Sequence, residues 1–166
     1  MSNTVWLTII GLGEDGLDGL SLASQNALTE ATIIFGSRRL LSFLKTRFQG
    51  KKIEWPVPFE KGVSMLLAQR GKSVVMLASG DPFWFGAGNV IAKHIAEDEW
   101  VAHPNSSCFS LAACKLGWAI QDSICHALHA SPFSKIRKDL QYKQKLYFPE
   151  LSQHFQEHQF DFFHHK

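Results

Sequence analysis

Two acidic residues inside a glycine-rich loop near the start of the chain suggest what that loop could bind. Residues 11–16 (GLGEDG) satisfy the G-x-G-x-x-G pattern that, after a strand, marks a dinucleotide-binding loop. A pyrophosphate would be repelled by Glu14 and Asp15, and its helix should begin at the third glycine rather than near Ser21. The acidic loop suits a ligand without phosphates and with a cationic centre; an ordinary tight turn is the alternative interpretation.

A second cluster, residues 78–86 (ASGDPFWFG), follows a buried apolar run. In open α/β sheets, ligands bind at the carboxyl ends of such strands. Gly80 lets the backbone approach a neighbour closely, Asp81 can accept hydrogen bonds, and Pro82 stiffens the loop. Three consecutive aromatic residues, 83–85, then offer flat surfaces. A Gly-Asp-Pro turn alone is common, so the information lies in the whole segment at a strand end.

A third cluster places serines where a helix should begin, in residues 104–113 (PNSSCFSLAA). Serines at a helix start ordinarily cap the first turn. The hydroxyls of Ser106 and Ser107, together with the free N–H groups of that turn, could equally hold the polar end of a ligand.

Short apolar runs alternate with longer helical patterns along the first two thirds of the chain. The runs are continuous and β-branched, which is typical of strands buried on both faces of a parallel sheet. The alternating order predicts an α/β fold with right-handed crossovers. The expected strands are residues 5–10, 32–35, 73–78 and 101–103, and the expected helices are residues 20–31, 37–48, 86–96 and 106–116. In the first helix Ser21 is the expected N-cap, with Leu22, Ala23, Ala27 and Leu28 on the inward stripe.

The pattern changes character after residue 118, so we expect an N-terminal domain over residues 1–118 and the start of a second domain over 119–166. A strand at 124–129 and a helix at 132–141 would open this second domain. After about residue 147 the sequence becomes rich in Phe and His and loses periodicity, which predicts a poorly packed tail.

Composition excludes several classes of protein. A hydrophobic content of 45% supports a real core, and a net charge of only +2 gives no case for nucleic acid as a partner. Cys108, Cys114 and Cys125 form no C-x-x-C pair, which suits a reducing cytosol and predicts buried apolar roles. No run approaches the ~18 apolar residues of a membrane span. His154 and His158 lack matching ligands, so we expect no metal site, and we expect a soluble, cytoplasmic protein.

The three clusters, in this order, resemble the tetrapyrrole (corrin/porphyrin) methylase family. That family shows a glycine-rich turn after its first strand, a Gly-Asp-Pro loop after a later strand, and a Pro-x-x-Ser helix start. Further segments resemble a branch that methylates a corrinoid precursor, and the resemblance covers about residues 5–140. These segments are GLGEDGLDGLS (11–21), GSRRLL (36–41), WPVPF (55–59), LASGDPFWFG (77–86) and FSLAACKLGWAIQD (109–122).

The resemblance implies a parallel-sheet N-terminal domain followed by an incomplete second α/β domain. It implies S-adenosylmethionine as methyl donor, and the acidic loop is consistent with this, because a sulfonium is cationic and the ligand carries no phosphate. The implied donor-site residues are Gly11, Gly13, Glu14, Ser79, Gly80, Asp81, Trp84, Ser106 and Ser107.

The implied acceptor is a corrinoid macrocycle of the precorrin-6Y type, in cobalamin biosynthesis, that bears many carboxylates. Arg38 and Arg39 are the candidates for holding them, since arginine suits bidentate recognition; a solvated helix face is the alternative. Alignment of the two reactants supplies much of the rate in such a transfer, so the catalytic side chains stay unknown. Asp81 could orient the donor, and Asp15 could stabilise charge near it.

Two departures from the family pattern leave alternatives open. Residues 129–131 read His-Ala-Ser where the family usually has His-Gly-Arg, and the tail replaces most of a second domain, which suggests C-terminal truncation. The chain would then be a non-catalytic remnant. An NAD(P)-dependent oxidoreductase is the other alternative, with Arg38 and Arg39 near a 2′-phosphate. The sequence leaves open whether two chains form a homodimer and whether a decarboxylating methyltransferase subunit is a separate partner.

Overall fold

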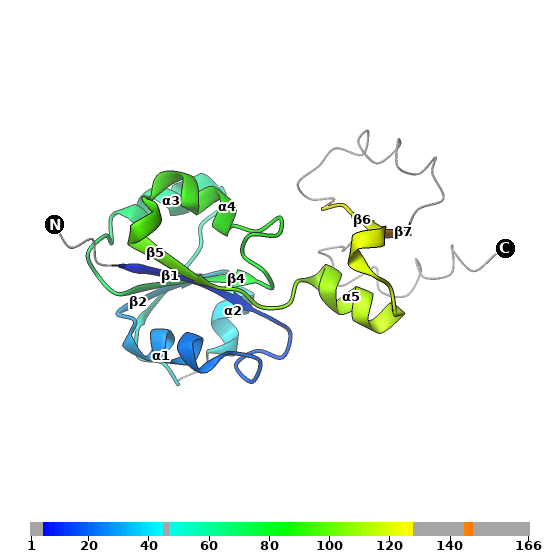
Figure 1. The fold of residues 1–166 in the computed structure, drawn as a ribbon. Coiled ribbons are helices and arrows are strands. Elements are labelled where there is room, and N and C mark those ends of the chain that lie inside the picture. The colour runs from blue at the N-terminus through cyan, green and yellow to red at the C-terminus, as the bar shows by residue number, and fades with distance from the viewer. Residues whose placement is uncertain (1–4, 45–46, 128–144, 148–166) are drawn as a thin grey trace. The chain divides into compact units, whose positions relative to one another are not determined.

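The structure is a computed structural model of the 166-residue chain, and it describes residues 5–44, 47–127 and 145–147. The chain divides into two compact units, Met1–Ser107 and Cys108–Lys166. The boundary between these units, after Ser107, lies earlier in the chain than the boundary after residue 118 that the sequence suggests. The domain organisation stays a prediction. Figure 1 shows the first unit as a sheet with helices on both sides.

The first unit is built on a five-stranded sheet in which every described strand pair is parallel. The strand order is β3-β2-β4-β1-β5, so all five carboxyl ends lie at one edge of the sheet. The predicted α/β class with a parallel sheet is confirmed. The strands are β1 (Leu7–Leu12), β2 (Ile33–Gly36), β3 (Lys51–Glu54), β4 (Val74–Ser79) and β5 (Trp100–His103).

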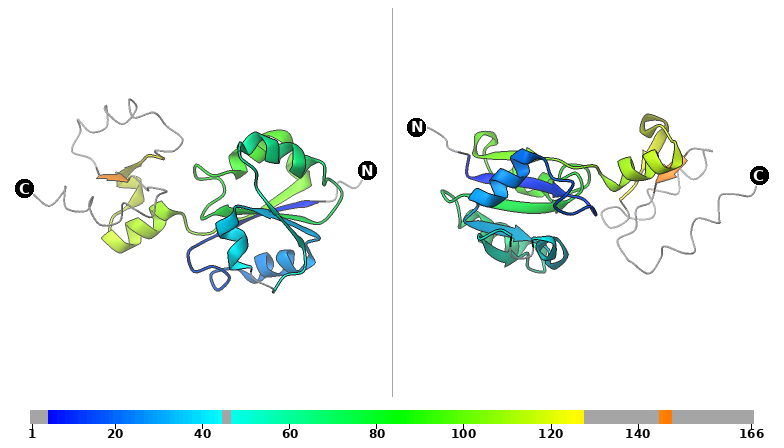
Figure 2. Two further views of the ribbon diagram at one scale, coloured as in Figure 1. Left: turned by 180° about the vertical axis from the view of Figure 1, so that it is seen from behind. Right: turned by 90° about the horizontal axis from the view of Figure 1, so that it is seen from below.

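Helices cover both faces of this sheet. One face carries α1 and α2 and the opposite face carries α3 and α4, as the two sides of the sheet show in Figures 1 and 2. The helices are α1 (Leu22–Glu30), α2 (Arg38–Phe43), α3 (Phe59–Leu67) and α4 (Gly88–Ile91), and the short 3₁₀ turns are η1 (Ala92–His94) and η2 (Glu97–Glu99).

The core consists of two apolar layers, one on each face of the sheet. Successive strand residues point to opposite faces. In β1, Leu7 and Ile9 therefore pack beneath α3 and α4, while Ile10 and Leu12 pack against α1 and α2. Because both faces are covered, the central strands need apolar residues at every position, which explains the continuous runs in the sequence.

The first helix departs from its expected apolar stripe. Ser21 is the N-cap, as predicted, and its hydroxyl accepts a hydrogen bond from the Ser24 backbone N–H at 3.2 Å. The inward positions predicted for Leu22 and Ala23 are wrong, because the Leu22 side chain is 74% exposed and Ala23 is exposed as well. Ser24 and Leu28 are buried one helical turn apart, and a residue two positions before Ser24 lies on the far side of the helix.

The second unit contains α5 (Cys108–Leu116), η3 (Ile120–Asp122), β6 (Ser123–Cys125) and β7 (Lys145–Tyr147). The last two strands pair in parallel. Phe109 and Ala113 form the buried centre of a small cluster of its own. The predicted helix at 132–141 and the tail with its histidine pair lie outside the described residues. Within the described ranges, no helix has the length and apolar composition needed to cross a bilayer.

The cysteines are less buried than the sequence suggests. Cys108 and Cys114 are exposed and Cys125 is half-buried, so the expectation of three buried side chains is wrong. The buried face of α5 is centred on Phe109 and Ala113, and the two exposed cysteines lie beside that face. Local burial nevertheless raises the pKa of the Cys108 and Cys125 thiols, which favours their neutral form.

Candidate functional site

The loops that follow β1 and β4 leave the sheet in opposite directions. These strands are neighbours, with Gly11 opposite Ala78 and Leu12 opposite Ser79. The chain then enters α1 on one face of the sheet, and α4 on the other. Such a reversal is the point at which open α/β sheets bind their ligands, because the two loops diverge there.

Three loops, distant in sequence, come into contact at this edge. The Gly80 backbone N–H donates to the Leu12 carbonyl at 3.0 Å, and the Asn105 N–H donates to the Gly80 carbonyl at 3.3 Å. A Cβ placed on Gly11 would overlap the Gly80 carbonyl oxygen and lie 2.7 Å from the Asn105 nitrogen. The loops after β1, β4 and β5 therefore meet through bare backbone, which only glycine allows at this spacing.

Two further glycines keep this edge open. A Cβ on Gly13 would come within 2.5 Å of Asp15 Oδ1. Gly80 has a φ of +59°, and a Cβ there would lie 3.1 Å from the Ser106 carbonyl oxygen and 3.3 Å from the Ser107 Cα. The structure thus brings Gly11, Gly13 and Gly80 together with residues 105–107.

The acidic loop after β1 is a succession of turns. The Gly16 N–H donates to the Gly13 carbonyl at 3.1 Å, and the Asp18 N–H donates to the Asp15 carbonyl at 3.3 Å. The first helix begins only at Leu22. No helix N-terminus in this described loop therefore opens at the third glycine, as a pyrophosphate site requires, and the geometry disfavours the dinucleotide alternative.

The loop after β4 is held by its own hydrogen bonds. Oδ1 of Asp81 accepts a bond from the Phe83 N–H at 2.8 Å, so this carboxylate braces the turn that carries it. The Asn89 side-chain amide donates to the Phe83 carbonyl at 2.7 Å, and the Gly88 N–H donates to the Pro82 carbonyl at 2.9 Å. These hydrogen bonds within the loop hold its backbone in a defined conformation.

The three aromatic residues of this loop do not share one role. Phe83 stacks on Trp100, with ring centroids 5.3 Å apart, and packs against the core. Trp84 and Phe85 are exposed and contact each other edge to face at 6.5 Å. The exposed flat surfaces that the sequence suggested thus come from residues 84 and 85.

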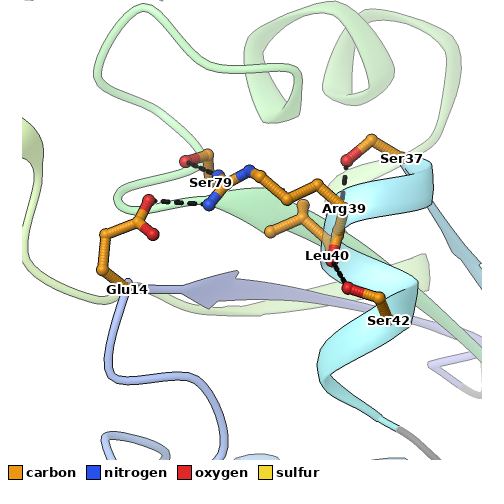
Figure 3. Close-up of polar contacts among 6 residues, drawn as sticks. All are labelled: Glu14, Ser37, Arg39, Leu40, Ser42 and Ser79. Carbon is orange, nitrogen blue, oxygen red and sulfur yellow. Dashed lines mark hydrogen bonds and ion pairs between the residues drawn. The ribbon is translucent and has the colours of Figure 1, made fainter. Parts of the chain in front are cut away.

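The two arginines point to different places. Nη1 of Arg39 lies 2.6 Å from Glu14 Oε1, and Nη2 donates to the Ser79 hydroxyl at 3.2 Å (Figure 3). Nε of Arg38 pairs instead with Glu54 on β3 at 3.2 Å. Arg39 therefore joins the candidate donor-site residues Glu14 and Ser79, whereas Arg38 lies with the edge strand.

Asn105 is a candidate that the sequence reasoning missed. Its Oδ1 accepts a hydrogen bond from the Ser106 N–H at 2.7 Å, which fixes the orientation of the amide. Among the described residues, its buried Nδ2 finds no hydrogen-bond acceptor, and this atom lies 3.4 Å from a Cβ built on Gly13. A buried donor without an acceptor is costly. The available signal was an amide side chain two residues after the end of β5.

Curated relatives match most of this chain. It is 42% identical over 135 residues to a precorrin-6Y C(5,15)-methyltransferase [decarboxylating] of Sinorhizobium sp, covering 81% of this chain and 33% of that protein. It is 32% identical over 133 residues to the enzyme of the same name from Mycobacterium tuberculosis, covering 80% of this chain and 34% of that protein. The chain thus spans about a third of the length of these relatives.

The fold is also found among solved structures. The cobalamin biosynthesis precorrin-6Y methylase of Archaeoglobus fulgidus superimposes with a TM-score of 0.63 at 19% identity, covering 88% of this chain and 72% of that one. At this identity the likeness concerns the fold alone. The model of the family described as Tetrapyrrole (Corrin/Porphyrin) Methylases matches residues 6–147. With that match spanning most of the sequence, this chain belongs to the tetrapyrrole methylases.

Proposed function

We propose that this chain forms the donor-binding part of an S-adenosylmethionine-dependent C-methyltransferase that acts on a corrinoid precursor of the precorrin-6Y type in cobalamin biosynthesis. One observation carries this proposal. Three loops meet through glycine backbone at the point where the connections after β1 and β4 leave for opposite faces of the sheet. The precorrin-6Y names belong to relatives that are longer than this chain, and they support the choice of acceptor.

The residues present fit this methyl donor. The glycine contacts leave the backbone of the loops free of side chains, so a flat nucleoside could approach closely. The Asn105 Nδ2 lacks an acceptor among the described residues, and a polar ligand could supply one. The residues that would hold the donor are Gly11, Gly13, Glu14, Ser79, Gly80, Asp81, Trp84, Ser106 and Ser107, together with Asn105.

In this proposal, the residues of the site position the reactants and balance the charge of the donor. When bound, S-adenosylmethionine supplies an electrophilic methyl group on a positively charged sulfur and leaves as neutral S-adenosylhomocysteine. The loop braced by Asp81 would fix the direction of approach, since alignment of the reactants supplies much of the rate. Glu14 and Asp15 would favour a cationic ligand through their charge. No proton transfer is assigned to a side chain.

The residues that would contact the acceptor are proposed in less detail than those of the donor site. Arg39 lies at the edge of the sheet beside Glu14 and is the better placed of the two arginines to hold an acceptor carboxylate. Arg38 pairs with Glu54 on β3 instead, and we assign it no contact with the acceptor. We also propose that the protein is cytoplasmic, that it forms a homodimer, and that a separate decarboxylating methyltransferase subunit is its partner.

Calorimetric titration of the 166-residue chain with S-adenosylmethionine and S-adenosylhomocysteine tests the donor site. We expect saturable binding of both ligands and no shift of the thermal unfolding midpoint by NADPH. Stabilisation by NADPH without binding of either sulfur ligand would overturn the proposal in favour of an oxidoreductase. A methyl-transfer assay with the corrinoid precursor then separates an active domain from one that binds without turnover.

A further inference from the structure

Arg39 joins residues that follow three neighbouring strands. It lies after β2, whereas Glu14 follows β1 and Ser79 ends β4, and these strands are adjacent in the order β2-β4-β1. In Figure 3 the guanidinium lies between the Glu14 carboxylate and the Ser79 hydroxyl. The negative charge that Glu14 would offer a cationic ligand is therefore already balanced by Arg39.

This ion pair is exposed, and so it is readily exchanged. The Arg39 side chain is 43% exposed and the Glu14 side chain 78% exposed. Ion pairs at such positions contribute about 0 to 1 kcal/mol, because water solvates both separated charges well. A carboxylate that meets Arg39 in bidentate geometry would compete effectively with Glu14.

We propose that Arg39 is a positioning residue that controls how much of the Glu14 charge the methyl donor meets. Without an acceptor, Arg39 neutralises Glu14, and only the charge of Asp15 then favours the cationic over the neutral sulfur ligand. A carboxylate of the acceptor draws Arg39 away and leaves Glu14 uncompensated, so the cationic donor is preferred over its neutral product. The inference rests on the proposed function and adds a coupling between the two ligands.

Arg38 provides a matched control. It has the same side chain, it neighbours Arg39 in sequence, and it also forms an exposed ion pair. Its partner Glu54 lies on β3, which is separated from β1 by β2 and β4. A change at Arg38 thus removes an equivalent charge and an equivalent ion pair without altering the compensation of Glu14.

The readout is the ratio of the dissociation constants of S-adenosylhomocysteine and S-adenosylmethionine, measured by calorimetry on the 166-residue chain. Each ratio is measured with and without the polycarboxylate macrocycle uroporphyrin. In the wild type we expect the ratio to rise about three- to tenfold when uroporphyrin is added, as for one charge in a partly solvated site. Arg38→Gln should behave in the same way.

The variants at the ion pair should lose this response in opposite ways. Arg39→Gln should show the high ratio without uroporphyrin, because Glu14 is then uncompensated, and Arg39→Lys should restore the response. Glu14→Gln should keep a low ratio under both conditions. Equal unfolding midpoints of Arg39→Gln and Arg38→Gln would exclude a folding defect as the cause.

Other outcomes would overturn the inference. If Arg39→Gln weakened both sulfur ligands equally, Arg39 would bind a group common to them, such as their carboxylate. A ratio unaffected by Arg39→Gln would also refute it, while leaving the donor site itself intact. Failure of every variant and of the wild type to bind either ligand would instead refute the proposed function, and the coupling with it.

Discussion

Gly80 combines two demands that a single residue type meets. Its φ of +59° is disfavoured for residues with a Cβ, and backbone atoms of Ser106 and Ser107 crowd the place where a Cβ would stand. Gly71 shares only the first demand, since its φ is +87° and nothing lies within 4 Å of its virtual Cβ. Comparing the two positions separates backbone strain from close approach.

Gly80→Ala should therefore lower the free energy of unfolding more than Gly71→Ala. We expect about 1 kcal/mol for Gly71→Ala from the left-handed conformation alone, and about 1 to 2 kcal/mol more for Gly80→Ala. Urea denaturation measures both values. Only Gly80→Ala should also weaken S-adenosylhomocysteine binding. Equal losses of stability would show that the loops after β4 and β5 can separate without cost.

Asn105 places an amide donor beside Gly13 at a cost to stability. Removing its side chain deletes the bond to the Ser106 N–H, worth about 1 kcal/mol, but it also removes a buried donor whose burial costs about 1 to 3 kcal/mol. We expect Asn105→Ala to leave the free energy of unfolding unchanged or raised by about 1 kcal/mol, while S-adenosylhomocysteine affinity falls about tenfold, the equivalent of about 1.4 kcal/mol. Unchanged affinity would show that Nδ2 faces no ligand.

At the scale of elements, burial rather than helix propensity decides which side chains of α1 contribute to the stability of the fold. Leu28 is fully buried in the layer beneath α1 and α2, whereas Leu22 on the same helix is largely exposed. Leu28→Ala should cost about 2 to 5 kcal/mol in urea denaturation, because it leaves a cavity. Leu22→Ala should change stability by less than about 0.5 kcal/mol. Similar effects at the two positions would show that Leu22 also packs against the core.

Two elements escaped the sequence analysis for different reasons. The edge strand β3 reads KKIE, and its lysines and glutamate have low strand propensity; it forms because β2 pairs with it in register. Helix α3 carries Gly62 in its interior, which weakens a helical pattern. That glycine admits the Trp55 ring, which a Cβ at residue 62 would overlap. In both cases a partner outside the element decides the local structure.

At the scale of the whole molecule, the two main apolar layers lie entirely within the first unit. A fragment of residues 1–107 should therefore unfold cooperatively in urea, with a midpoint close to that of the corresponding transition in the full chain. The small cluster around Phe109 and Ala113 belongs to the second unit and should not be required. A broad, non-cooperative transition of the fragment would show that the first unit depends on the second for its fold.

The sequence by itself determined the local features of this protein. Continuous apolar runs predicted three of the five strands of the first sheet, because a strand covered on both faces needs apolar residues at each position. A fourth strand was predicted at the short segment 101–103. The glycine-rich loop, the Gly-Asp-Pro loop and the serine helix start indicated the family, which the family model then confirmed. Ser21 as a helix cap is likewise a matter of neighbouring residues, and it was predicted.

Only the tertiary structure decided how the candidate site is assembled. Segments far apart in the chain produce the adjacency of β1 and β4, the pairing of Arg39 with Glu14 and Ser79, and the position of the buried Asn105 Nδ2 beside Gly13. Arg38 and Arg39 are equivalent in sequence, but Arg38 pairs with Glu54 on β3 and Arg39 with Glu14 in the loop after β1. Side-chain partners are set by strand order, and strand order arises from long-range packing that local pattern does not encode.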